Sequence, residues 1–70
     1  MFYLYAETDS ETEVDVALVE HINKEIDENG INVATNQIEL EQAALTISKM
    51  IGENKNVKIV VSQYPNILCV

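Results

Sequence analysis

Cysteine and histidine are scarce in this sequence, which limits the ways the fold can be stabilised. The 70 residues include one cysteine, Cys69, and one histidine, His21. One cysteine cannot form an internal disulfide, and one cysteine with one histidine cannot complete a structural zinc site. A domain of this size has a small core and commonly needs such a staple or a partner. We therefore expect self-association or binding to a larger protein to bury additional surface.

Arginine is absent, and lysine occurs four times, against twelve acidic residues and a net charge of −8. Residues 1–35 contain nine acids and one lysine, whereas residues 36–70 contain three of each. So few cations can neutralise few phosphates, which disfavours direct binding of nucleic acid or of an anionic membrane. A one-sided negative charge instead favours a basic protein partner.

Long apolar runs and catalytic motifs are missing as well. No apolar stretch approaches the roughly 20 residues that span a bilayer, and Met1 is followed by aromatic residues rather than by a basic leader. We expect a cytoplasmic protein of a bacterial or virus-infected cell. The sequence has no glycine-rich phosphate loop, nucleophile elbow or metal-ligand spacing, so we expect no enzyme, no cofactor, no metal and no catalytic residue.

Three features resemble chemical sites but favour a structural interpretation. The alternating acids of residues 7–15 resemble a calcium loop, yet the sixth position counted from Asp9 is Val14 where such loops need glycine. Cys69 has apolar neighbours that would not lower its thiol pKa, so packing in a strand is favoured. His21 borders an apolar helical stripe without a second catalytic group, which favours a packed ring with one solvated nitrogen.

The remaining pattern predicts a single α/β domain over residues 1–70 with element order β-α-β-α-β-β. Strands are expected at residues 2–6, 31–35 and from 57, with a turn at residues 62–66 and a last strand at residues 67–70. Alternating strands and helices favour parallel crossovers, and hence a mixed four-stranded sheet with a helix on each face or both on one. The first strand should be central. The strand from Val57 should be covered on both faces, with the last strand at its edge.

Two helices are predicted from their caps and apolar stripes. Ser10 with Glu13 forms a capping box before the first helix, which should end near Glu28 before Asn29 and Gly30. Asn36 and Gly52 should cap the second helix. The core stripes are expected to be Val14, Ala17, Leu18, Ile22 and Ile26 on the first helix and Leu40, Ala43, Ala44, Ile47 and Ile51 on the second.

The far side of the first helix is the main candidate for function. Glu13, Glu20 and Asp27 recur every seven residues, about 10 Å apart along the axis, with Val16 between them and Glu28 nearby. These five residues are the predicted partner-binding surface of an inhibitor or regulator. Its partner would be basic, for example a nucleic-acid-handling protein, as for virus-encoded antagonists of host defence. The alternative is a solvated face that only keeps the protein soluble.

A second hypothesis is a structural or assembly role through self-association. Ile38 and Leu45 do not fit the stripe of the second helix. Either one docks on the preceding loop and the other on the C-terminal residues, or the pair forms the centre of a homodimer or partner contact. The uncharged edge at Ile67, Leu68 and Cys69 would also invite strand pairing. A more distant alternative is a domain that sequesters a small molecule between subunits.

Overall fold

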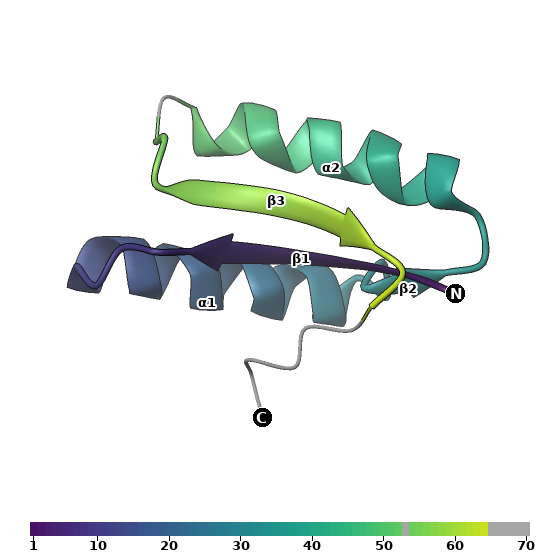
Figure 1. The fold of residues 1–70 in the computed structure, drawn as a ribbon, viewed down its shortest axis with the longest axis horizontal. Coiled ribbons are helices and arrows are strands. Elements are labelled where there is room, and N and C mark those ends of the chain that lie inside the picture. The colour runs from purple at the N-terminus through teal and green to yellow at the C-terminus, as the bar shows by residue number, and fades with distance from the viewer. Residues whose placement is uncertain (53, 65–70) are drawn as a thin grey trace.

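The computed structural model describes residues 1–52 and 54–64 (Figure 1). Strands and helices alternate along them: β1 (Phe2–Thr8), α1 (Glu13–Glu28), β2 (Val33–Ala34), α2 (Gln37–Ile51) and β3 (Val57–Ser62). The predicted order is thus found for the first five elements. The predicted turn lies partly, and the predicted last strand of residues 67–70 entirely, outside the described residues.

The sheet has the strand order β2-β1-β3, so β1 is central as predicted. Both neighbours run antiparallel to β1. The predicted parallel crossover from β1 through α1 to β2 is therefore wrong. The crossover from β2 through α2 to β3 does join strands of the same direction, but β1 lies between them, so every pairing in the described three-stranded sheet is antiparallel. The first crossover is absent because residues 29–36, which connect the two helices, pass the start of β1 in the antiparallel direction. Only Val33 and Ala34 of this connection pair with β1, as β2.

Both helices cover the same face of the sheet. The register places Leu4 opposite Val61 and Ala6 opposite Ile59, so these side chains point to one face. Buried residues of both helices pack on that face, where the core consists of Leu4, Ala6, Ile22, Ile26, Leu40 and Val57. In Figure 1, α1 lies alongside β1 and α2 lies alongside β3, and the two helices run in opposite directions. Burial of β3 on both faces was thus a wrong prediction, because the helices cover only the face of Val57.

Helix α1 begins later than its capping box predicted. Its N-cap is Thr12, whose side chain accepts a hydrogen bond from the Asp15 N–H, and Ser10 is not the cap. The Ser10 N–H instead donates to Thr8 Oγ1 at the end of β1, which holds Ser10 in the connection. The predicted end is confirmed, since α1 stops at Glu28 and Gly30 has a φ of 68°.

The core stripe of α1 was only partly predicted. Ile22 and Ile26 are buried and Leu18 packs beside them, but Val14 is 75 % exposed. Ala17 is exposed as well. The core-facing position of the first turn is instead occupied by a buried carboxylate, Asp15. The prediction from hydrophobicity alone therefore assigned the wrong side of the first turn to the core.

Helix α2 agrees with its predicted caps and stripe. The Ile38 N–H donates to Asn36 Oδ1 at 2.9 Å, and Gly52 ends the helix with a φ of 71°. Leu40 is buried, and the other four predicted residues pack against the core at partial burial. The side of α2 toward the sheet is therefore the predicted one.

A side-chain amide of α1 replaces the missing length of β2. Beyond the short β2, the Ala6 N–H donates to Asn23 Oδ1 at 2.8 Å, and Asn23 Nδ2 donates to the Ala6 carbonyl at 3.2 Å. The two bonds satisfy the backbone of β1 where no second strand pairs with it on that side, as buried peptide groups require. This contact joins the middle of α1 to the middle of β1.

Replacing Asn23 by alanine should lower the free energy of unfolding by about 1–3 kcal/mol, because it leaves a partly buried N–H and carbonyl unsatisfied. Urea denaturation followed by circular dichroism measures the change. Asn29→Ala is the matched control, since its amide caps the exposed Glu25 carbonyl, and it should cost less than about 1 kcal/mol. Equal losses in the two variants would contradict this role for Asn23.

Candidate functional site

The outer side of α1 carries a line of carboxylates, here called the acidic row: Glu13, Glu20 and Asp27. All three are exposed, on the side of the helix away from the buried Ile22 and Ile26. Fourteen residues separate the first from the last, so the row is about 21 Å long. The predicted exposure of this row is confirmed, and Val16 beside it is also exposed.

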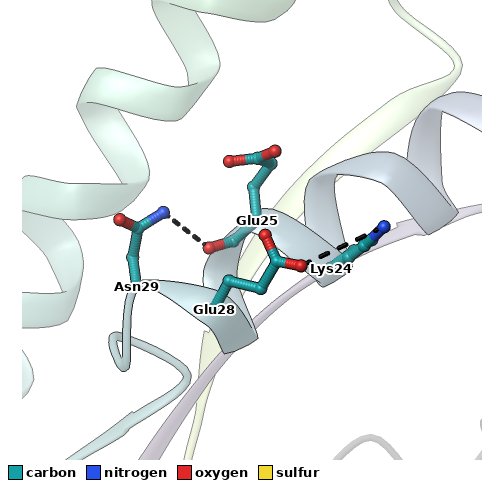
Figure 2. Close-up of polar contacts among 4 residues, drawn as sticks. All are labelled: Lys24, Glu25, Glu28 and Asn29. Atoms are coloured by element: carbon teal, nitrogen blue, oxygen red, sulfur yellow. Dashed lines mark hydrogen bonds and ion pairs between the residues drawn. The ribbon is translucent and has the colours of Figure 1, made fainter.

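Few cations compensate this charge. The only ion pair within residues 1–52 and 54–64 joins Lys24 Nζ to Glu28 Oε1 at 4.0 Å (Figure 2). Such exposed pairs one helical turn apart contribute only about 0.3–0.5 kcal/mol. Glu28, the fifth predicted partner-binding residue, is thus occupied by Lys24, whereas the three residues of the acidic row make no ion pair in this part of the chain.

Helix α1 holds most of the negative charge of the protein. It contains six carboxylates and one lysine, a formal charge of −5, out of −8 for the whole chain. Helix α2 contains Glu39, Glu41 and Lys49, a formal charge of −1. The charge asymmetry of the sequence is therefore also an asymmetry between the two helices.

An apolar groove separates the two helices. No Cα atom of α1 lies within 8 Å of a Cα atom of α2, whereas helices that pack directly have axes only about 8–10 Å apart. The groove has a volume of about 340 Å³. Its apolar lining comes from both helices and from the residue after the turn: Leu18, Ile22, Ile26, Ile31, Ile47, Met50 and Ile51.

In the part of the chain that the structure describes, the polar residues of the groove lining come from α1 and its C-cap. His21, Glu25 and Asn29 belong to its lining, and no lysine does. Asn29 Nδ2 donates to the Glu25 carbonyl oxygen at 2.7 Å, while the Glu25 carboxylate extends separately from the Lys24–Glu28 pair (Figure 2). On the opposite wall, Met50 is 81 % exposed. The groove thus presents an apolar floor beside an unpaired carboxylate.

Asp15 is the one buried charged residue among those described, and its burial was not predicted from the sequence. Thr12 Oγ1, Asn56 Nδ2 and Asn54 Nδ2 donate hydrogen bonds to its carboxylate at 2.8, 3.0 and 3.1 Å.

Hydrogen bonds from Ser10, then Thr12 and Asn54, lower the pKa of Asp15 from 3.8 to about 2, because they stabilise the ionised form. The carboxylate ties the start of α1 to the segment before β3. Its oxygens are occupied by protein donors, so we assign it a structural role.

The other candidate residues are placed as follows. Ile38 and Leu45 are 62 % and 64 % exposed, so neither is covered by a neighbouring segment among the described residues. The C-terminal residues, on which one of them was expected to dock, lie outside that part of the chain. His21 is exposed and belongs to the lining of the groove together with Leu18 and Ile22. Ile67, Leu68 and Cys69, predicted for self-association, lie outside the described residues. No group of three potential metal ligands occurs in residues 1–52 and 54–64.

Comparisons of the chain with family models, with curated proteins and with solved structures found no match. In the part of the chain that the structure describes, neither helix has the length and apolar character needed to cross a membrane. The acidic row and the groove between α1 and α2 are therefore the features on which a function can be based.

Asp15→Asn should lower stability at neutral pH, because the amide cannot accept every hydrogen bond that the carboxylate accepts. The folded-state pKa of about 2 lies below the ordinary value of 3.8, so the unfolded chain binds the proton first as pH falls. The stability that ionised Asp15 contributes is complete above pH 3.8 and is lost toward pH 2. Urea midpoints of the wild type and Asp15→Asn should therefore converge over this interval.

Glu11→Gln provides the control for this experiment, because it removes an exposed carboxylate close to the same helix start. Its urea midpoint should remain near that of the wild type from pH 7 to pH 4. A constant difference between the wild type and Asp15→Asn down to pH 2 would contradict the assigned pKa.

Proposed function

We propose that this protein is a small, non-enzymatic binding protein whose helix α1 docks on a basic surface of another protein. The supporting observation is the acidic row of Glu13, Glu20 and Asp27, exposed along one side of α1 and making no ion pair within the described residues. The core needs none of these side chains, since it is built from the opposite side of the helix.

The physics of the row suits a charge-driven encounter. The row is about 21 Å long, whereas salt at physiological concentration screens exposed charges beyond a Debye length of about 8 Å. A partner must therefore lie close to the helix along the whole row to interact with all three carboxylates. Complementary charge raises association rates and excludes like-charged partners more than it adds raw affinity. The proposed partner therefore carries lysines or arginines spaced to face the row.

A protein that handles nucleic acid would supply such a surface. Its basic groove is built to meet phosphates, and a line of carboxylates with a spacing of about 10 Å could occupy part of it. An inhibitor or regulator acting by this occlusion is the specific form of the proposal, including a virus-encoded antagonist. The binding itself requires neither a catalytic group nor a cofactor.

Neutralising the acidic row by Glu13→Gln, Glu20→Gln and Asp27→Asn should weaken binding to the basic partner about tenfold or more at roughly 50 mM salt. Three lost charge pairs of about 0.5 kcal/mol each give this factor. The measurement is capture from a lysate of the cells that contain the protein, quantified by mass spectrometry. Carbodiimide, which joins carboxylates directly to lysines, then identifies the contacting side chains.

A triple variant with the same net charge is the control: Asp9→Asn, Glu39→Gln and Glu41→Gln. These acids are exposed but lie outside the acidic row, so this variant should retain its captured proteins and its cross-links to α1. Equal loss in both variants would show that only net charge matters. Capture unchanged in the row variant, or cross-links confined to other carboxylates, would overturn the proposal.

A second candidate function is self-association through α2. The observation that supports it is the exposure of Ile38 and Leu45, which lie seven residues apart on one side of the helix. Lys49, four residues after Leu45, belongs to the same exposed side and is the only basic residue of α2. Two copies meeting here would bury apolar surface away from the acidic row, so the repulsion between their α1 helices would be weak.

Leu45→Glu tests this second function, because it places a carboxylate at the centre of the apolar pair. If the pair is an interface, the variant should change from dimer to monomer at a concentration where the wild type is dimeric. Sedimentation velocity or light scattering gives the mass, and circular dichroism checks the fold. A wild type that is monomeric at high concentration, or an unchanged dimer in Leu45→Glu, would contradict it.

A further inference from the structure

The groove between α1 and α2 leaves part of the apolar core accessible. Leu18 and Ile47 are only partly buried although they pack against the core, and Met50 at the rim is the most exposed of the large apolar residues. An engineered apolar cavity of about 150 Å³ holds a benzene molecule. A groove of about 340 Å³ therefore has room for an apolar anchor the size of one or two side chains.

We infer that this groove binds an amphipathic, basic segment of the partner protein, whose apolar residues enter the groove while its lysines or arginines face α1. The inference rests on the proposed function, which supplies the basic partner. It adds a second contact with a different physical origin, namely burial of apolar surface. The mode is that of a helix in a groove, in which anchors recur at positions i, i+3, i+4 and i+7.

Charge complementarity favours this occupant. Among the described residues, the only ionisable groups in the lining are Glu25 and His21, and no lysine belongs to it. Glu25 lies on the helix that holds −5 of the charge, so a cation next to an apolar anchor would gain its carboxylate as a partner. A second copy of this chain would instead place two such helices against each other, and repulsion between like charges opposes that arrangement.

Met50 suits such a contact chemically. Its unbranched, polarisable side chain adapts to anchors of different shape, as methionines do in binding surfaces that accept varied helices. Met50 and Glu25 both line the groove, Met50 from α2 and Glu25 from α1. An occupant would therefore contact α1 through charge and α2 through apolar surface, and would join the two helices along the groove.

The test uses three synthetic peptides and two-dimensional NMR spectra of the labelled protein. The first peptide, about 14 residues of lysine and leucine, has leucines at the helix-in-groove spacing. The second has the same composition with leucines spread around the helix, and the third replaces the leucines by serine. The first should bind most tightly, and its largest shifts should fall on Leu18, Ile47 and Met50.

Two matched variants of α2 locate the apolar contact. Met50→Gln removes an exposed apolar side chain from the groove, and Leu45→Gln removes one from another side of the same helix. Both positions are exposed, so both variants should fold. Met50→Gln should weaken binding of the first peptide about tenfold, whereas Leu45→Gln should leave it unchanged.

The outcomes separate this inference from the proposed function. The three peptides could bind with equal affinity, and this binding could be lost in the acidic-row variant but unaffected by Met50→Gln. That result would overturn the groove inference and leave the charge-driven function standing. Groove shifts caused by a neutral apolar compound but not by the first peptide would also overturn it, in favour of a small-molecule site. A tenfold effect of Met50→Gln on the first peptide alone supports it.

Discussion

Burial on one side of the sheet is the constraint on which the rest of this structure depends. The face shared by Leu4, Ala6 and Val57 is the only one that both helices cover in the described residues. Each helix therefore needs a narrow apolar stripe and has a wide solvent side that is free to vary. On α1 that side carries carboxylates, and on α2 it carries Ile38 and Leu45. The candidate surfaces follow from this division.

The same constraint explains the groove. Two helices on a three-stranded sheet follow different strands, α1 along β1 and α2 along β3 (Figure 1). Because β2 is short, it does not pair with Ala6 of β1, and the Asn23 side chain of α1 forms hydrogen bonds with the Ala6 N–H and carbonyl instead. These bonds hold α1 beside this edge of the sheet and away from α2. The apolar side chains between the helices then remain partly accessible. The carboxylate of Glu25 and this apolar surface are thereby brought together in the lining of the groove.

Much of this arrangement could be predicted from the sequence, because the signals are local. The caps at Asn36 and Gly52, the stripe of α2 and the exposure of the acidic row all follow from spacing along a single helix. The central position of β1 followed from its aromatic and apolar composition. Failures came where distant residues decide the structure: the direction of β2, the pairing of Asn23 with Ala6, and the burial of Asp15 by Asn54 and Asn56. Spacing within one element carries no information about partners 17 to 41 residues away.

The central claim is that this one-sided packing concentrates negative potential along the outer side of α1. Paramagnetic relaxation of amide protons by otherwise similar cationic and anionic cosolutes measures that potential residue by residue. The account predicts that the ratio of the cationic to the anionic effect is highest for the amides near Glu13, Glu20 and Asp27, and clearly lower near Ile38 and Leu45. A ratio that is uniform over both helices would contradict it.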